Sequence, residues 1–173
     1  MTNAPMQTTY RVRPICRGDR DGLVRFYATL SPESRASRFH GAAAGIGAHA
    51  AAYFCGPDHR HREGLVAETI GEAAPPEIIG HLCLEPTGTG AAEMAIAVAD
   101  AWQQHGVGRA LLTGAGDWAR AHGIRTLTAS MLWGNAAILA LVRSMGWPVV
   151  LGDGDIGTVE ARVELGGTLP HAA

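Results

Sequence analysis

The stretch from Ala92 to His122 predicts a strand, a glycine-containing loop and a helix in direct succession. Its first part alternates Met94, Ile96 and Val98 with Glu93, Ala95 and Ala97, which is the period of a strand. Apolar or small residues then recur at helical spacing, at Val107, Ala110, Leu111, Gly114, Ala115 and Trp118. A glycine loop that leads into a helix directs several backbone N–H groups at one place. Such a place suits a phosphate or a diphosphate.

Three kinds of ligand use a loop of this type. A Walker phosphate loop ends in Gly-Lys-Ser/Thr, and Gly108-Arg109-Ala110 lacks that ending. A dinucleotide fingerprint has Gly or Ala where Leu111 stands, and it normally opens its domain, whereas about a hundred residues precede this loop. The third ligand is coenzyme A. The alternative without a ligand is an ordinary strand–helix turn in which glycine serves tightness alone.

The pattern Gln103-x-x-Gly106-x-Gly108 resembles the Gln/Arg-x-x-Gly-x-Gly/Ala motif of the GCN5-related N-acetyltransferase (GNAT) family. The preceding strand and the following helix stand where this family has them, and a second family signature is partly present from Asn135 to Trp147. The resemblance implies acetyl-CoA as co-substrate, direct transfer of the acetyl group to an amine, and no metal. It assigns co-substrate binding to Ile96, Ala97, Val98, Gln103, Gln104, His105, Gly106, Val107, Gly108, Arg109 and Asn135. Asn135 is also expected to cap the helix that follows it.

A more specific resemblance lies in Leu30 to Phe39, which reads Leu-Ser-Pro-Glu-Ser-Arg-Ala-Ser-Arg-Phe. It is similar to a segment in the acetyltransferase domain of bacterial Pat-type protein lysine acetyltransferases, as is Trp102-Gln103 before the glycines. The acceptor implied is a protein lysine. A small amine, such as a polyamine or an aminoglycoside, is the alternative. Val142 replaces a tyrosine that often serves the family as general acid, so a non-catalytic acyl-CoA-binding module is also open.

Acetyl transfer to a lysine requires a base, because the free amine has a pKa of about 10.4 and arrives mostly charged. Glu93 is the predicted base, since it shares a strand face with small residues that leave room for a ligand, and a partly desolvated carboxylate has a raised pKa. The Pat-like pattern also has a glutamate at this place. Glu68 and His81 are weaker candidates that we expect to be structural. Cys83 is not needed as a nucleophile, because direct attack suffices.

The order of predicted elements is strand, helices, three strands, helix, strand, helix and two strands. This order indicates an α/β domain with one mixed, mostly antiparallel sheet flanked by helices, and it agrees with the GNAT order. We expect the domain to span residues 10–165, between a flexible start (1–9) and a disordered tail (166–173). Asp19 is expected to cap the first helix.

The composition limits the kinds of partner and the cellular location that we expect for this chain. The net charge of −2 disfavours a general nucleic-acid binder, and the apolar runs are too short to span a bilayer. Three widely spaced cysteines favour reduced thiols and a cytoplasmic location. His59 and His61 could suggest a metal, but a solvated loop explains them better. The sequence contains no lysine, and it does not decide between a monomer and a homodimer.

Overall fold

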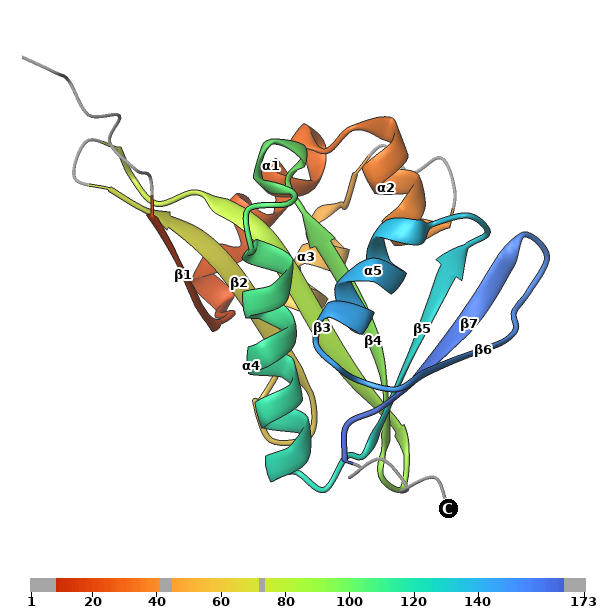
Figure 1. Ribbon diagram of the computed structural model, residues 1–173. Helices are drawn as coiled ribbons and strands as arrows, with labels where there is room; N and C mark the ends of the chain where they lie inside the picture. Colours follow the sequence, from red (N-terminus) through yellow and green to blue (C-terminus); the bar gives the residue numbers. More distant parts are fainter. Residues whose placement is uncertain (1–8, 41–44, 72–73, 167–173) are drawn as a thin grey trace, which may run out of the picture.

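The computed structural model describes residues 9–40, 45–71 and 74–166. Its centre is a seven-stranded sheet in the order β1-β2-β3-β4-β5-β7-β6 (Figure 1). The strands are β1 (Thr9–Pro14), β2 (Glu63–Ile70), β3 (Ile78–Gly88), β4 (Ala91–Val98), β5 (Thr126–Leu132), β6 (Val149–Asp153) and β7 (Thr158–Glu164). The helices are α1 (Arg20–Thr29), α2 (Pro32–Phe39), α3 (Ala48–Phe54), α4 (Val107–Ala121) and α5 (Ala136–Ser144), with 3-10 turns at Arg17–Asp19 and Asp100–Trp102. The expected α/β fold class and element order are confirmed.

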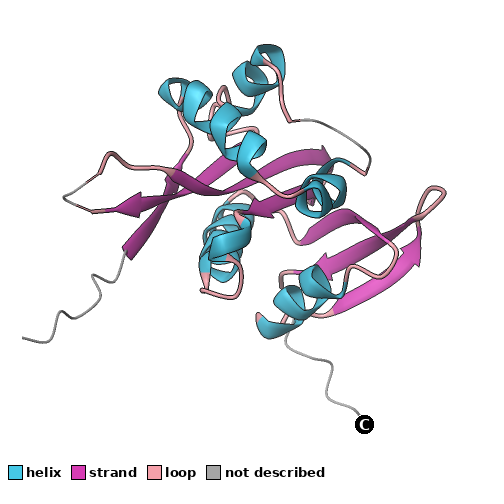
Figure 2. Cartoon of the chain, turned by 90° about the horizontal axis from the view of Figure 1, so that it is seen from above, coloured by secondary structure: helices cyan, strands magenta, loops and turns pink. Residues whose placement is uncertain are grey.

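Helices cover both faces of the sheet, as the view from above shows (Figure 2). Side chains of α1 and α3 pack on one face around the fully buried Leu23 and Tyr27. On the other face, α4 and α5 enclose the larger core, where Leu111, Leu112 and Val142 are fully buried. Each face of the sheet therefore has its own apolar core. A polar side chain can be buried on one face without contacting the core on the other.

The apolar face of α4 is rotated from the one that the sequence spacing predicts. Val107, Leu111 and Ala115 are buried as expected, but the helix also buries Leu112, Gly116 and Ala119. The predicted Ala110, Gly114 and Trp118 lie half-buried at the edge of this face. Two glycines allow close packing of this helix: a Cβ on Gly116 would lie 2.8 Å from Trp147 Cζ2, and one on Gly114 would lie 3.0 Å from Leu65 Cδ1.

The sheet divides between β4 and β5. All other neighbouring strands are antiparallel, whereas these two run parallel and pair only at Ala91–Thr126, Ala92–Leu127 and Glu93–Thr128. Beyond Glu93 the two strands diverge, which Figure 1 shows as an opening between β4 and β5. On its β3 side, β4 stays paired as far as Val98. The edge of β4 from Met94 to Val98 is therefore without a strand partner on the β5 side.

The predicted flexible ends lie almost entirely outside the described residues, whereas the predicted cap of the first helix is wrong. Residues 1–8 and 167–173 of the expected flexible ends lie outside the described residues, and Thr9 belongs to β1. Asp19 stands at the N-cap position of α1 but does not cap it. Its carboxylate instead accepts two hydrogen bonds from Arg13 (both 2.8 Å) and one from the Cys16 backbone N–H (2.7 Å). An arginine within reach is a stronger partner than a neutral helix amide.

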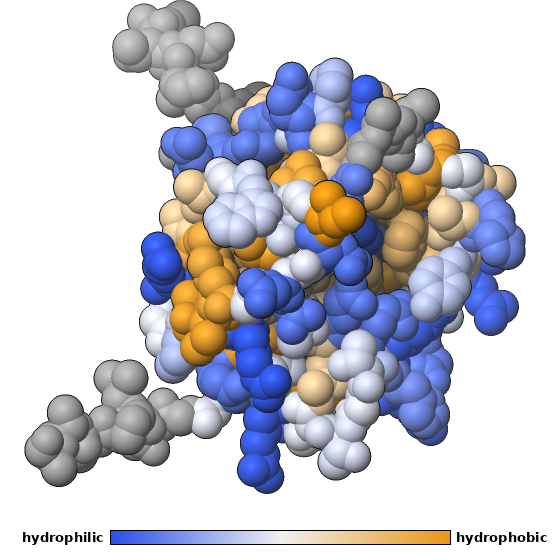
Figure 3. Space-filling view, turned by 90° about the vertical axis from the view of Figure 1, so that its right-hand side faces the viewer, coloured by the Kyte–Doolittle hydropathy of each residue, from blue (hydrophilic) through white to orange (hydrophobic). Residues whose placement is uncertain are grey.

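The surface beside β6 and β7 carries exposed apolar side chains. Figure 3, which views the molecule from the right-hand side of Figure 1, shows orange side chains interrupted by polar ones. Trp133, Val150, Leu151 and Ile156 are among the exposed large apolar residues. None of the described helices is both long enough and apolar enough to cross a membrane.

Candidate active site

The N-terminus of α4 presents unused backbone donors. The first hydrogen bond inside the helix runs from the Ala110 N–H to the Gly106 carbonyl (3.0 Å), so the N–H groups of Val107, Gly108 and Arg109 have no acceptor within the helix. No side chain caps this end. The loop before it has left-handed backbone at Gln104 (φ 62°) and Gly106 (φ 85°). A non-glycine residue held in this conformation is typical of a functional loop. The arrangement suits an anion.

The two glycines of the loop motif are required for different physical reasons. Gly106 supplies a positive φ, which costs a residue with a Cβ about 1–2 kcal/mol. Gly108 has ordinary helical backbone, but a Cβ there would lie 2.9 Å from Leu141 Cδ2. It therefore allows α5 to approach the start of α4. The Arg109 guanidinium donates to the Ser144 carbonyl at the end of α5, and His105 Nδ1 lies 2.7 Å from the Gln103 carbonyl oxygen.

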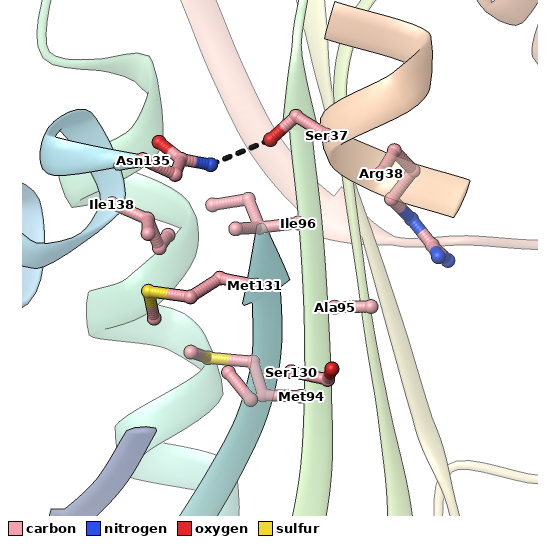
Figure 4. Close-up of a pocket in the computed structure, with 10 residues that line it drawn as sticks. Ser37, Arg38, Met94, Ala95, Ile96, Ser130, Met131, Asn135 and Ile138 are labelled. Carbon is pink, nitrogen blue, oxygen red and sulfur yellow. Dashed lines mark hydrogen bonds between the residues drawn. The ribbon is translucent and has the colours of Figure 1, made fainter. Parts of the chain in front are cut away.

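A cleft of about 50 Å³ lies where β4 and β5 diverge. Its walls come from α2, β4, β5 and α5: Ser37, Arg38, Met94, Ala95, Ile96, Ala129, Ser130, Met131, Asn135 and Ile138. Figure 4 shows Asn135 and Ser37 reaching toward each other across it. Asn135 Nδ2 donates to Ser37 Oγ at 2.6 Å. The expected helix cap at Asn135 is therefore wrong: it occupies the N-cap position of α5, but its side chain makes no cap hydrogen bond.

Helix α2 is attached to the glycine loop by a polar network that the sequence did not predict. The Asp100 carboxylate accepts hydrogen bonds from Ser31 N–H (2.9 Å), Ser31 Oγ (2.8 Å) and Ser34 Oγ (2.7 Å). Gln103 Nε2 donates to Ser34 Oγ (3.2 Å) and to the Val98 carbonyl (3.3 Å). The hydroxyls of the Ser-Pro-Glu-Ser segment thus join α2 to the motif residue Gln103. None of the residues of α2 is fully buried, and these bonds add to the apolar packing of Phe39 in holding the helix.

Glu93 lies where β4 and β5 part, opposite Glu85 on β3 and Thr128 on β5. It shares a strand face with Ala95 and Ala97, as the sequence predicted. Its side chain is exposed, so the expected partial desolvation is not met. The structure brings Ile96 and Asn135 together in the cleft, with Glu93 beside it on β4 and Gln103–Arg109 beyond the far end of that strand.

The weaker catalytic candidates have structural partners. Glu68 is buried and forms ion pairs with Arg11 and Arg13 (both 2.6 Å). Hydrogen bonds from Arg13 lower the pKa of Glu68 despite the opposing effect of burial. His81 is fully buried with Nδ1 2.8 Å from the Tyr27 hydroxyl. Burial, with the nearby positive charge of Arg38, lowers the pKa of His81 to about 3.

Three further residues, Val142, His59 and His61, bear on the chemistry that the site can perform. Val142, the position at which the family resemblance leads one to expect a tyrosine, is fully buried in the main core and offers no proton donor. His59 and His61 contact different carboxylates, those of Glu63 and Asp58. Within residues 9–40, 45–71 and 74–166, no group of three or more His, Cys, Asp or Glu side chains could hold a metal ion.

A mixed sheet opens between two parallel strands, and uncapped helix amides lie beyond the end of the opening, an arrangement that suits an extended anionic ligand. Residues 33–147 match the Acetyltransferase (GNAT) family, and the chain belongs to this family. It is accordingly an N-acetyltransferase with acetyl-CoA as co-substrate. No curated protein matches the sequence.

Solved structures agree with this assignment. The GNAT domain of PAT from S. lividans is 32% identical, with a TM-score of 0.79 and 90% of each chain covered. The yncA protein from Salmonella typhimurium, solved with acetyl-CoA, is 20% identical, with a TM-score of 0.72, 95% of this chain and 99% of that one covered. A GCN5-related N-acetyltransferase from Kribbella flavida has 22% identity and a TM-score of 0.67, over 90% and 95% of the two chains. The last two similarities concern the fold alone.

Proposed function

We propose that the chain transfers the acetyl group of acetyl-CoA directly to the side-chain amine of a protein lysine. The observation that carries this proposal is the 32% identity to the GNAT domain of S. lividans PAT over 90% of both chains. The Pat-like segment Leu30 to Phe39 supports it, because that segment forms α2, a wall of the cleft. We also propose a cytoplasmic location, which the free thiols of Cys16, Cys55 and Cys83 support.

In this proposal the diphosphate of acetyl-CoA lies on the N–H groups at the start of α4, within the loop Gln103–Arg109. The thioester arm lies along the β4 edge from Ile96 to Val98, which has no strand partner on its β5 side, and pairs with it as an added strand would. The cleft holds no more than a few water molecules, so α2 and α5 have to separate to admit the arm. The Asn135–Ser37 bond is the contact that changes, which frees the Asn135 amide for the co-substrate.

Glu93 takes the proton from the lysine ammonium, directly or through water, at the point where the arm ends. The neutral amine then attacks the thioester carbon. A backbone N–H of β4 stabilises the oxyanion that forms on the carbonyl oxygen. The C–S bond breaks, and the sulfur leaves as a thiolate, since a thiol pKa of about 8.5 makes it an adequate leaving group. The attacking nitrogen gives up its second proton, which passes through water to the thiolate, so that the products are the amide and free coenzyme A. This route requires no acid at Val142.

The acceptor is tested by following free thiol release from acetyl-CoA with three kinds of acceptor: lysine-containing proteins, a polyamine and an aminoglycoside. We expect the highest kcat/KM with a protein, and mass spectrometry should find the acetyl group on lysine Nζ. The chain contains no lysine, so every acetyl-lysine detected belongs to the acceptor. A higher kcat/KM with the polyamine or the aminoglycoside would replace the protein acceptor with a small amine.

A further inference from the structure

Arg38 places a positive charge beside the reacting end of the cleft. It is the penultimate residue of α2 and lines the cleft together with Ala95. Its Nη2 donates to Cys83 Sγ (3.5 Å), and Cys83 is the register partner of Ala95 on β3. Figure 4 shows the side chain extending from α2 on the Ala95 side. The guanidinium therefore lies on the same face of the sheet as Glu93, beside Ala95, which is two residues further along β4.

This guanidinium has no carboxylate partner among the described residues, although its Nε atom is buried and without a hydrogen bond. Arg13, by contrast, binds the carboxylates of both Asp19 and Glu68. Glu93 acts on Arg38 only through space. An arginine side chain stays charged at any physiological pH.

The side chains that contact Arg38 directly are uncharged at neutral pH. Burial raises the pKa of the Tyr27 hydroxyl to about 12 and also raises the pKa of the Cys83 thiol. His81 is neutral, as described above. The rings of Phe39 and Phe54 lie 5.0 and 5.5 Å from the guanidinium carbon. These contacts hold the arginine in place but leave its charge without a counter-ion.

A buried charge without a partner is costly, and arginine meets a carboxylate with two parallel hydrogen bonds. We infer that Arg38 binds a carboxylate of one of the two substrates. The carboxylate comes either from the end of the transferred acyl chain, as in a succinyl group, or from the acceptor next to its amine. This inference rests on the proposed acyl transfer and adds a specificity determinant to it.

The test compares charged and uncharged substrates within each variant. In the first arm, succinyl-CoA is compared with butyryl-CoA, using a lysine peptide without acidic residues. In the second arm, acetyl-CoA is used with two peptides that carry Asp or Asn beside the lysine. We expect one arm to show a preference of about tenfold in kcat/KM for the charged substrate, the size of one charge-assisted hydrogen bond. The arm that shows it identifies the source of the carboxylate.

Arg38→Gln should abolish this preference and Arg38→Lys should keep part of it, whereas Arg25→Gln on the exposed side of α1 should retain it fully. The ratio of two substrates is independent of the fraction of folded enzyme, so a destabilised variant remains informative. Ratios near one in both arms, or a preference that survives in Arg38→Gln, would overturn the inference. If neither acetyl-CoA binding nor thiol release occurs with any substrate pair, the proposed function itself fails.

Discussion

Asn135 on α5 donates a hydrogen bond to Ser37 on α2, and this bond of 2.6 Å closes the cleft between β4 and β5. Both residues belong to segments that resemble acetyltransferase signatures, but they are 98 positions apart in the chain. The bond thus joins the two signatures at the place where the thioester arm is proposed to enter.

Removing either partner of this bond should cost about 1 kcal/mol of unfolding free energy, which is typical of one hydrogen bond. The double variant Asn135→Ala/Ser37→Ala should lose less than the sum of the two single losses, because both remove the same interaction. Urea denaturation measures these values. Since Asn135 is also proposed to bind the co-substrate once this bond opens, Asn135→Ala should raise the KM for acetyl-CoA, whereas Ser37→Ala should not. Equal increases would remove Asn135 from the binding site.

The glycine loop can be tested with a matched pair of variants at the two ends of α4. Gly106 and Gly123 both have positive φ (85° and 73°), so Gly106→Ala and Gly123→Ala should each lose about 1–2 kcal/mol of stability. Only Gly106→Ala should weaken acetyl-CoA binding, by about tenfold or more, because it displaces the amides proposed to bind the diphosphate. Calorimetric titration provides the dissociation constants. Unchanged affinity in Gly106→Ala would contradict this binding mode.

The proposed base is tested by Glu93→Gln, which keeps the shape of the side chain and removes its charge. The rate of acetyl transfer should fall by about 10²–10⁴-fold, the usual contribution of a general base, with little change in acetyl-CoA affinity. The control is Glu85→Gln, since Glu85 lies opposite Glu93 on β3 but pairs with Arg62 (3.3 Å). A similar fall in both variants would indicate an effect of surface charge rather than base catalysis.

His81 should make stability depend on pH. Its pKa is lowered from 6.5 to about 3 in the folded protein, so the unfolded chain binds one more proton between these values. The free energy of unfolding should therefore decrease as the pH falls below 6.5, by up to about 1.4 kcal/mol per pH unit from this residue. In His81→Gln, which retains an acceptor for the Tyr27 hydroxyl, this part of the decrease should be absent. Denaturation at pH 7 and pH 5 measures it.

The sequence predicted the features that depend on neighbours along the chain. The strand period of β4, the glycine loop and α4 are local patterns, and the loop motif led to the family that the comparison confirms. The attachment of α2 was not predictable in this way, since Ser31 and Asp100 are 69 positions apart. The cap at Asn135 was predicted wrongly because its amide bonds Ser37, 98 positions away, and the cap at Asp19 because Arg13, only six positions away, is a stronger partner than the helix amide.

The short pairing between β4 and β5 has a mechanical consequence. Three residue pairs, ending at Glu93–Thr128, hold β4 and β5 together, and beyond them the two strands are not paired to each other. A small rotation about these pairs produces little displacement next to Glu93, but it moves the far ends of the two strands, at Val98 and Leu132, much further. A rotation of this kind would widen the cleft between β4 and β5 while leaving the geometry around Glu93 almost constant.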